Sequence, residues 1–332
     1  MKKTITLAAT ALAVASIALV GCSSDDDSDS GDTPDTLVLA MEPSDETANV
    51  QASGETIAKA LTDALGIDVE VTVPTDYAAL ITALGTGQAD IAFTAPASMV
   101  QAIDNGAGTA LLQATRDGSR SYVSQWYTND PDKYCDTDVV EKEETIDSSG
   151  TTAAFKFCNG VDTAEYGDEV GYDALKKITP DTKIAFVDEG SASGYQFPVV
   201  QLEELGVIDA PEDLTGVTFA GGHPQAVLSV ARGEAEIGTS YDDARVDAVA
   251  EEDAVNDLVV FAWSTPIPND GVVVASDLDS DLQAKIKTAL QGLFDNADAK
   301  EALYSAYEID GFDEVDSDAL DLVRKVSEQF GE

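Results

Sequence analysis

From residue 37 onward, short apolar runs alternate with longer segments in which apolar residues recur every three or four positions. A short apolar run bounded by turn residues predicts a buried strand, whereas the longer spacing predicts an amphipathic helix. Strands that alternate with helices are typical of α/β folds, whose sheets are largely parallel. The sequence therefore predicts an α/β protein built on mostly parallel sheets flanked by helices.

The first series of elements lies in the N-terminal third of the chain. Strands are expected at residues 37–40, 67–73 and 89–94. Helical spacing between them is carried by Val50, Ile57, Leu61 and Leu65, and then by Tyr77, Leu80, Ile81 and Leu84. Gly66 is suited to end the first helix, and Pro96 to begin a third.

A second series follows a polar segment at residues 128–182, which holds two cysteines and shows little sustained periodicity. We expect this segment to be mainly a long insertion. Strands are then expected at residues 183–187, 217–220, 237–239, 258–263 and 271–275. Helices are expected within residues 194–205, 224–232, 242–252 and 279–330.

The folded part of the chain spans roughly 300 residues, which is large for one hydrophobic core and comfortable for two. We therefore expect two lobes, joined by two crossings of the chain that act as a hinge. Lobe 1 is expected to comprise residues 37–125 and 266–332, and lobe 2 residues 126–265.

The N-terminus carries the pattern of a secretory signal peptide, expected at residues 1–21. Lys2 and Lys3 precede an uncharged apolar run at residues 5–20. This run is shorter than the roughly 20 residues that span a bilayer. The segment is therefore expected to direct export and to be removed.

The stretch Leu19-Val20-Gly21-Cys22 matches a bacterial lipobox, in which the cysteine receives the lipid. An ordinary signal peptide followed by a chance cysteine is the alternative. With lipid on Cys22, residues 22–36, rich in Ser and Asp, would form a flexible tether. The protein is then expected outside the cytoplasm, held to the outer face of the cell membrane by the lipid alone.

Export also bears on the two remaining cysteines. Two cysteines in an exported protein most often pair, so we expect a disulfide between Cys135 and Cys158, with two free thiols as the alternative. His223 is the only histidine, and the sequence contains no close pair of cysteines. No metal site is therefore expected.

Acidic residues outnumber basic ones by 63 to 18, which gives a formal net charge of −45. Nucleic-acid binding depends on a basic surface, so a nucleic-acid partner is not expected. A small anionic ligand remains compatible with this charge, because salt screens exposed charges beyond about 8 to 10 Å. The electrostatic potential inside a closed cleft is then set mainly by the charges of its own walls.

Four turns stand at the carboxyl ends of expected strands, where open α/β sheets bind their ligands. They lie at residues 94–98, 189–194, 221–224 and 239–243. The first three precede helices, whose N-termini present unpaired N–H groups and a positive dipole end. These turns are therefore candidates for an anion site.

Several side chains in these turns could donate hydrogen bonds. Ser191 and Ser193 carry hydroxyl donors, Gly194 permits close approach of a ligand, and His223 can donate from its imidazole. A serine at such a position is also a common helix cap, and His223 can equally cap its own helix. For a single turn both interpretations stay open, whereas three converging turns favour an anion site.

The sequence contains no recognisable catalytic set. A Walker loop, a Gly-x-Ser-x-Gly elbow and a His-Glu-x-x-His motif are all absent. In a chain this acidic, a pair such as Asp242-Asp243 is expected to be a pair of solvated carboxylates. We therefore expect neither an enzyme nor a bound cofactor.

Five segments, in order, resemble the phosphate/phosphite/phosphonate branch of the ABC-transporter solute-binding proteins. They are Ala89-Asp90-Ile91-Ala92-Phe93, Ala185-Phe186-Val187-Asp188 leading into Ser191-Ala192-Ser193-Gly194-Tyr195-Gln196-Phe197-Pro198, Gly221-Gly222-His223, Tyr241-Asp242-Asp243-Ala244-Arg245 and Pro266-Ile267-Pro268-Asn269-Asp270. The resemblance covers most of the chain from residue 37 onward. It implies the two-lobed type II periplasmic-binding-protein fold, with the ligand between the lobes.

The resemblance also implies roles for single residues. In the family, phosphoryl oxygens are held by a Ser-x-Ser-Gly turn, a histidine and a tyrosine, which match Ser191, Ser193, His223 and Tyr77. Ala192 stands where relatives often have Thr, so one hydroxyl donor is missing.

Further positions follow from the same resemblance. Tyr122 matches an aromatic lid residue, and Asp243 and Asp270 match acidic positions that can engage an amine on the ligand. With the adjacent turn residues, the expected ligand-binding set is Tyr77, Thr94, Ala95, Tyr122, Ser191, Ala192, Ser193, Gly194, His223, Tyr241, Asp243 and Asp270.

The resemblance implies capture of a small phosphorus oxyanion, such as a phosphonate or phosphite, and its delivery to the permease and ATPase of an ABC importer. The protein is expected to act as a monomer. One alternative is a binding protein for another oxyanion or a small organic solute such as a sulfonate. Another is a ligand-sensing lobe for a signalling partner, since a fold alone fixes no ligand.

Overall fold

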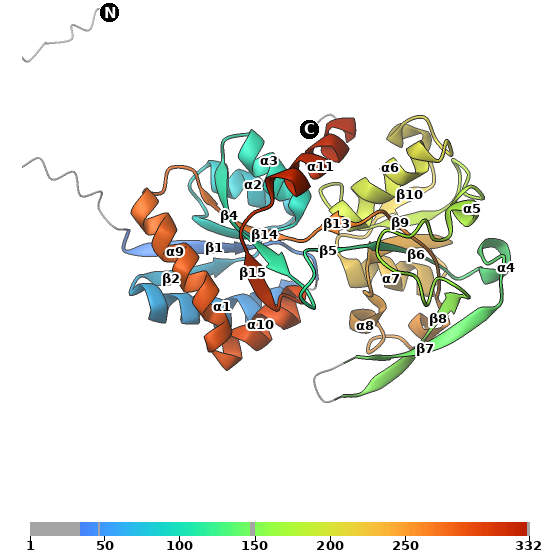
Figure 1. Ribbon diagram of the computed structural model, residues 1–332, viewed down its shortest axis with the longest axis horizontal. Helices are drawn as coiled ribbons and strands as arrows, with labels where there is room; N and C mark the ends of the chain where they lie inside the picture. Colours follow the sequence, from blue (N-terminus) through green and yellow to red (C-terminus); the bar gives the residue numbers. More distant parts are fainter. Residues whose placement is uncertain (1–33, 46, 147–149, 331–332) are drawn as a thin grey trace, which may run out of the picture. The chain divides into compact units, whose positions relative to one another are not determined.

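The computed structural model describes residues 34–45, 47–146 and 150–330, which form two α/β lobes (Figure 1). We call the part built on a six-stranded sheet the first lobe, and the part built on a seven-stranded sheet the second lobe. The expected signal peptide and the lipobox cysteine, Cys22, lie outside the described residues.

The sheet of the first lobe has the strand order β15-β4-β14-β3-β1-β2. Its strands are β1 (Thr36–Met41), β2 (Asp68–Thr72), β3 (Ile91–Thr94), β4 (Gly108–Thr115), β14 (Gly271–Ala275) and β15 (Gly311–Asp313). The helices of this lobe are α1 (Thr47–Leu65), α2 (Tyr77–Gly85), α3 (Pro96–Asp104), α9 (Ser280–Gly292), α10 (Ala297–Tyr307) and α11 (Ser317–Ser327), with short 3₁₀ turns η4 (Leu293–Asp295) and η5 (Glu328–Phe330). Helices α1, α9 and α10 share one buried apolar cluster with the sheet, and α2, α3 and α11 share another.

The sheet of the second lobe has the strand order β10-β9-β11-β6-β12-β8-β7. Its strands are β6 (Ser124–Thr128), β7 (Val139–Thr145), β8 (Thr152–Cys158), β9 (Ile184–Phe186), β10 (Val217–Phe219), β11 (Ile237–Tyr241) and β12 (Val259–Trp263). The helices are α4 (Pro131–Tyr134), α5 (Tyr172–Leu175), α6 (Phe197–Glu204), α7 (His223–Ala231) and α8 (Arg245–Ala248), with a π-helical turn η1 (Ala192–Gln196) and 3₁₀ turns η2 (Pro211–Asp213) and η3 (Asp253–Asp257).

Part of the acidity of the chain serves to begin helices. Asp76, Asp279 and Asp316 each accept a hydrogen bond from a main-chain N–H in the first turn of α2, α9 and α11. Such N-caps satisfy donors that the helix itself leaves unpaired, and each is worth about 1 kcal/mol. Asn296 caps α10 in the same way.

The α/β fold class is confirmed, but the two sheets are mixed rather than mostly parallel. In the first lobe β1 pairs in parallel with β2 and β3, whereas β14 is antiparallel to β3 and β4. In the second lobe β9 is parallel to β10 and β11, whereas β6 is antiparallel to β11 and β12. The cause is chain direction, because β6 and β14 each enter a sheet directly from a crossing between the lobes and so run against its parallel strands.

The two crossings lie next to each other. Strands β5 (Ser121–Tyr122) and β13 (Ile267–Pro268) pair antiparallel between the two larger sheets (Figure 1). The carboxyl ends of the parallel strands in both lobes therefore face the same region, from which the crossings lead into the sheets.

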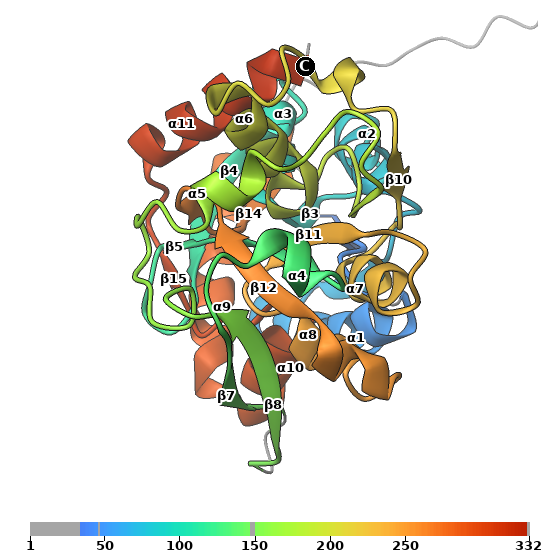
Figure 2. The ribbon, with the colours of Figure 1, turned by 90° about the vertical axis from the view of Figure 1, so that its right-hand side faces the viewer.

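The polar segment at residues 128–182 is more regular than its sequence suggests. It contains α4, β7, β8 and α5, and β8 joins the central sheet by pairing in parallel with β12 (Figure 2). Strand β7 pairs with β8 along its whole length, but its side chains are mostly exposed. An exposed edge strand needs no apolar alternation, which explains why periodicity did not reveal it.

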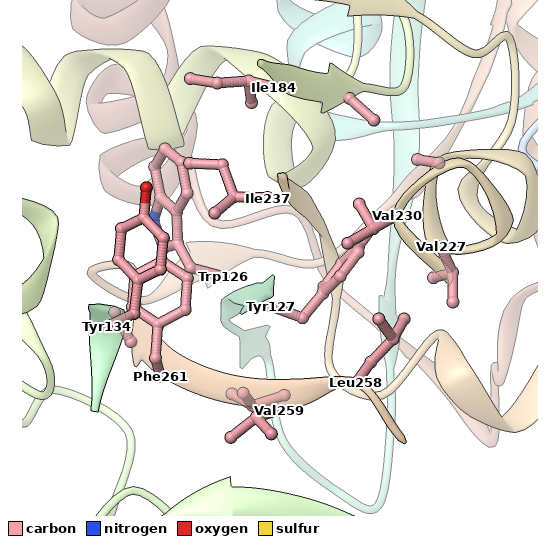
Figure 3. Close-up of a cluster of buried hydrophobic side chains, with 14 of the residues drawn as sticks. Trp126, Tyr127, Tyr134, Ile184, Val227, Val230, Ile237, Leu258, Val259 and Phe261 are labelled. Carbon is pink, nitrogen blue, oxygen red and sulfur yellow. The ribbon is translucent and has the colours of Figure 1, made fainter. Parts of the chain in front are cut away.

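The core of the second lobe is aromatic (Figure 3). Trp126 and Tyr134 both pack against Phe261, and all three side chains are buried. The indole Nε1 of Trp126 donates to Gln201 Oε1 at 2.9 Å, so the only polar atom of the indole is satisfied.

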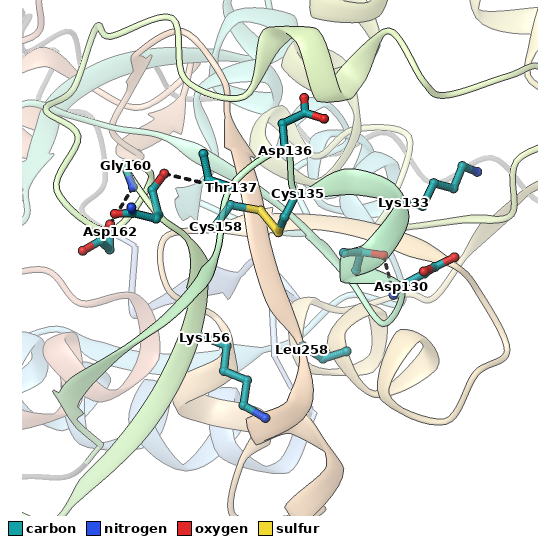
Figure 4. The surroundings of a disulfide bond; sticks show 12 residues. Asp130, Lys133, Cys135, Asp136, Thr137, Lys156, Cys158, Gly160, Asp162 and Leu258 are labelled. Carbon is teal, nitrogen blue, oxygen red and sulfur yellow. Dashed lines mark hydrogen bonds between the residues drawn. A yellow bond between two sulfur atoms is a disulfide. The ribbon is translucent and has the colours of Figure 1, made fainter.

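The structure contains a disulfide between Cys135 and Cys158, with their Cα atoms 5.4 Å apart (Figure 4). It ties the end of α4 to the end of β8, and so fastens the hairpin to the lobe. Across the described residues, no helix is both long enough and apolar enough to cross a membrane.

Candidate ligand-binding site

A cavity of about 500 Å³ lies between the lobes. Its walls come from the carboxyl ends of strands and from the starts of helices in both lobes. Nine of the twelve expected ligand-binding residues line it: Tyr77, Thr94, Ala95, Tyr122, Ser191, Ser193, His223, Tyr241 and Asp270. Ala192, Gly194 and Asp243 do not line it.

The serine turn presents hydroxyl groups from the second lobe. Ser191 is the N-cap of η1, where its Oγ accepts the Gly194 N–H at 3.1 Å, so its own hydrogen stays free to donate. Ser191 and Ser193 are each only 2% exposed. A Cβ on Gly194 would lie 2.4 Å from the Val187 side chain, so this glycine is required for packing rather than for ligand approach.

His223 begins α7 and is also buried. Its Nδ1 lies 2.7 Å from Ser240 Oγ, and its ring packs on Tyr241 with centroids 4.6 Å apart. Burial, together with the positive charge of Arg116, lowers the pKa of His223 to about 3, so the imidazole is neutral at physiological pH. With Ser240 donating to Nδ1, the hydrogen sits on Nε2, which has no protein partner in the described part of the chain.

Two tyrosines face the same space from the first lobe and the crossing. Tyr77 opens α2 and is 2% exposed, yet its hydroxyl has no hydrogen-bond partner among the described residues. Tyr122 lies on β5, with the guanidinium carbon of Arg116 4.9 Å from its ring centroid. Burial raises the pKa of both phenols, so both keep their hydrogens and can donate.

Tyr241 lines the cavity but directs its hydroxyl elsewhere. The hydroxyl donates to the carboxylate of Asp247, and the ring supports the imidazole of His223. Tyr241 is therefore placed to orient His223 rather than to donate to a ligand.

The turn at the start of α3 does not offer its donors to a ligand. The Thr94 hydroxyl donates to Glu42 Oε2 at 2.6 Å, and the Ala95 N–H donates to Glu42 Oε1 at 3.0 Å. Thr94 and Ala95 line the cavity, and their direct contact with a ligand stays a prediction that these two hydrogen bonds do not favour. The chain's own carboxylate occupies the position at this helix start that an anion was expected to take.

Asp270 also has a partner within the protein. Its carboxylate forms an ion pair with Arg116 Nη2, and the side chains of both residues are 15% exposed. Arg116 Nε donates to the main-chain oxygen of Tyr307 at 2.8 Å. An aspartate neutralised in this way is a weak site for an amine, and the arginine brings a positive charge to the cavity instead.

Asp243 is held away from the cavity. Its carboxylate pairs with Arg245, whose Nη2 lies 2.5 Å from Asp243 Oδ2. Arg245 is 1% exposed and lies over the rings of Phe155 and Phe157. The expected contact between Asp243 and an amine on the ligand stays a prediction, which this ion pair does not favour.

Among the cavity residues that sequence reasoning missed are Glu42 and Arg116. Each comes just after a strand of the first lobe, so the rule that ligands meet the carboxyl ends of strands applied to both. Glu42 was hidden by the abundance of carboxylates in the chain. Arg116 follows a long strand and belongs to no recognisable motif.

Two α/β lobes joined by a pair of crossing strands, with a polar cavity between them, define a two-lobed ligand-binding protein. The site offers hydroxyl and imidazole donors and one guanidinium, and these groups suit an anionic oxygen ligand. Among the described residues, no group of three or more His, Cys, Asp or Glu side chains is arranged to hold a metal ion.

Comparison with known proteins identifies the family. The family described as "ABC transporter, phosphonate, periplasmic substrate-binding protein" matches residues 39–320. The chain belongs to this family, whose members are substrate-binding components of transporters rather than enzymes. It is also similar to the "Phosphate-import protein PhnD" of Mycolicibacterium smegmatis, at 27% identity over 323 residues, covering 93% of this chain and 86% of the relative.

Solved structures show the same fold. A binding protein component of an ABC phosphonate transporter from Pseudomonas aeruginosa matches with a TM-score of 0.68 at 18% identity, covering 88% of this chain and 85% of the other. PhnD1 from Prochlorococcus marinus, in complex with methylphosphonate, matches with a TM-score of 0.68 at 16% identity, covering 90% and 99%.

Proposed function

We propose that this periplasmic-type binding protein captures a small phosphorus oxyanion in the cavity between its lobes. The observation that carries the proposal is the state of three buried donors. The hydroxyls of Tyr77 and Ser191 and the Nε2 of His223 face one cavity, and none of them donates to a described protein group. Buried donors without acceptors are costly unless a ligand satisfies them.

The hydrogen bonds available in the cavity are strong enough for tight binding of an oxyanion. A hydrogen bond to a charged group contributes about 1.5 to 3 kcal/mol, so four such bonds, less the cost of ordering, would give micromolar binding or better. Tyr122 and Ser193 supply further donors, and Arg116 supplies a positive charge. Besides Glu42, the cavity wall carries Asp45, Asp247, Asp270, Glu301 and Glu308. Burial raises the pKa of Glu42 to about 8, of Glu308 to about 7 and of Asp247 to about 6, and Asp270 pairs with Arg116, so the negative charge that an anion meets is smaller than the number of carboxyl groups suggests.

The lobes are proposed to close over the ligand. Residues 37–125 with 266–332 would move as one body and residues 126–265 as the other, with the hinge at the paired crossing strands β5 and β13. Closure would remove water and strengthen each hydrogen bond to the ligand.

The ligand is proposed to be a phosphonate, phosphite or phosphate without an amine. The relatives described above are associated by name with phosphate import and with methylphosphonate, which makes both compounds candidates here. Asp243 and Asp270 no longer favour an amine, because each pairs with an arginine.

Delivery is proposed to an ABC permease and ATPase, by a monomer anchored through lipid on Cys22. The support is the lipobox at residues 19–22 and the signal-like segment before it. Mass spectrometry of membrane-extracted protein should find the lipid on Cys22, and a Cys22→Ala protein should lose it. A mature N-terminus elsewhere, without lipid, would contradict the anchor.

The test is calorimetric titration of protein that begins after Cys22 against phosphite, phosphate, methylphosphonate, aminoethylphosphonate and sulfate in separate runs. We expect tight binding to at least one phosphorus compound and at least about a tenfold loss in Ser191→Ala and in His223→Ala. Ser229→Ala is a matched control, because Ser229 lies on α7 with His223 but bonds to the Gln225 carbonyl outside the cavity.

Other outcomes of this titration would favour other functions. Binding to sulfate in preference to every phosphorus compound would indicate a protein for another oxyanion. A lack of binding to every compound in the panel would contradict the proposal and favour an organic solute or a sensing role.

A further inference from the structure

Glu42 is a residue of the cavity wall that the proposed function does not use. It follows β1 directly and lines the cavity with Tyr77 and His223, and only 2% of its surface is exposed. Arg116 is the only lysine or arginine among the described residues that line this cavity, and it pairs with Asp270. Glu42 is thus a buried carboxyl group without a cation of its own.

The hydrogen bonds to Glu42 come from one side. Thr94, the last residue of β3, and the Ala95 N–H, just before α3, each donate to one of its two oxygens, and the Ser98 hydroxyl of α3 is a further donor near the carboxylate. A carboxylate has about four acceptor positions, so at least one is not used by these three donors. Because Glu42 lines the cavity, an unused position is available to a ligand.

The surroundings of Glu42 on balance disfavour the charged form of its carboxyl group. Burial contributes most, and the negative charge of Asp270 adds to it, so the pKa of Glu42 rises to about 8 in spite of its hydrogen bonds. Tyr307 donates to the main-chain oxygen of Glu42 rather than to its carboxylate. The other titratable or charged groups of the cavity wall are Asp45, Tyr77 of α2, Arg116 after β4, Tyr122 of β5, His223 of α7, Tyr241 of β11, Asp247 of α8, Asp270 before β14, Glu301, Tyr304 and Tyr307 of α10, and Glu308, and the Ser98 hydroxyl of α3 also lies near Glu42. Burial raises the pKa of Glu308 to about 7 and that of Asp247 to about 6, and both groups are present in wild type and in a Glu42 variant alike.

We propose that Glu42 shares one proton with the bound oxyanion, so that the ligand and a proton are held together in the site. An incoming anion places a further negative charge next to Glu42, and this charge favours the protonated carboxyl. The Ala95 N–H can only donate, so an acid hydrogen on Oε1 cannot point toward it and is expected to point into the cavity, toward a ligand oxygen. The inference rests on the proposed function, because it needs a ligand with an anionic oxygen.

The proton balance is simple. When Glu42 is already protonated, it donates its hydrogen to the ligand and nothing is taken from solvent. When Glu42 is ionised, one proton must come from solvent or from a P–OH group of the ligand. The affinity should therefore fall by up to about tenfold per pH unit above the pKa of free Glu42, and should not depend on this group well below it.

Glu42→Gln tests this directly, because the amide keeps a donor and an acceptor but cannot exchange a proton. Methylphosphonate would be titrated into wild type and Glu42→Gln between about pH 7 and pH 9. Each titration would be run in two phosphate-free buffers with different ionisation enthalpies, which gives the number of protons taken up. Ionisation of the free ligand affects both proteins equally, so the ratio of their affinities isolates the contribution of Glu42.

We expect wild type to take up more than about half a proton per ligand near pH 8.5, and Glu42→Gln to take up clearly less. The wild-type affinity should fall about tenfold relative to that of Glu42→Gln between pH 7 and pH 9. Glu70→Gln removes an exposed carboxylate of β2 in the same lobe and should behave as wild type.

Equal proton uptake and parallel pH profiles in wild type and Glu42→Gln would overturn the role of Glu42 while leaving the binding function intact. The wild-type uptake is measured without any variant, so a pH-independent wild-type affinity with no proton uptake would overturn it as well. Failure of the wild type to bind phosphite, phosphate or methylphosphonate would instead contradict the proposed function.

Discussion

Two shielded arginine–aspartate pairs of the described residues differ in one respect: Arg245–Asp243 is buried in the second lobe, and Arg116–Asp270 is partly buried at the cavity. Arg245 uses all of its nitrogens: Nε and Nη2 donate to Asp243, and Nη1 donates to two main-chain oxygens at 2.9 and 3.0 Å. Its side chain is 1% exposed. All three guanidinium nitrogens of Arg245 therefore have partners within the protein, and in this sense the pair is complete.

The cavity pair is incomplete. Arg116 donates through Nε and Nη2, but its Nη1 has no partner in the part of the chain that the structure describes. Its side chain is 15% exposed and borders the cavity. The comparison teaches that such an arginine is assigned by its unused donors. The two pairs have the same chemistry, but only Arg116 keeps a guanidinium nitrogen without a described protein partner at the cavity, which agrees with its proposed role in binding a ligand.

The largest effect is expected from breaking the complete pair. Arg245→Met leaves Asp243 buried without a cation, which should destabilise the protein by about 3 to 5 kcal/mol. Urea unfolding monitored by tryptophan fluorescence would measure the change. A loss below about 1 kcal/mol would show that the pair is not the structural element described here.

A smaller effect, on binding instead of folding, is expected at the cavity. Arg116→Gln should lower the affinity for the oxyanion about ten- to hundredfold, because a charge-assisted hydrogen bond is lost. Arg120→Gln is the matched control, since the side chain of Arg120 is 51% exposed and pairs with Asp313 outside the cavity. If both variants bound as wild type does, the distinction between the two arginine pairs would fail.

A third effect, confined to acid pH, sharpens the electrostatic side of the comparison. Arg116 contributes to the lowered pKa of His223, about 3 against an ordinary 6.5. The unfolded chain therefore binds a proton at this residue that the folded chain excludes, and stability should fall as the pH drops from about 6.5 toward 3. His223→Gln should lose this part of the pH dependence, measured as the difference between the two unfolding profiles.

Much of the architecture could be predicted from local pattern. Apolar runs and helical spacing located the longer helices and eight of the described strands, because each must bury one face, but they did not locate β4, β6 or β8, nor β15 within the tail expected to be helical. Strand direction was not predictable in this way, since it depends on where the chain enters a sheet after crossing between lobes. Strand β7 was missed because an exposed edge strand carries no apolar alternation.

The cavity was partly predictable as well. Ser191, Ser193, His223, Tyr77 and Tyr122 were expected at the site, and the structure brings them together around one cavity. What the sequence could not indicate is competition for the same donors. The N-terminus of α3 has the pattern of an anion site, yet a carboxylate 53 positions earlier in the chain accepts its hydrogen bond.

The central claim is that buried donors without protein acceptors form the ligand site. A crystal structure of the soluble protein with methylphosphonate, or with whichever phosphorus compound binds most tightly, tests it most directly. The account predicts the phosphoryl oxygens within hydrogen-bond distance of Tyr77, Ser191 and His223, with Glu42 beside one of them. A ligand bound elsewhere, with these three groups still unpaired, would contradict it.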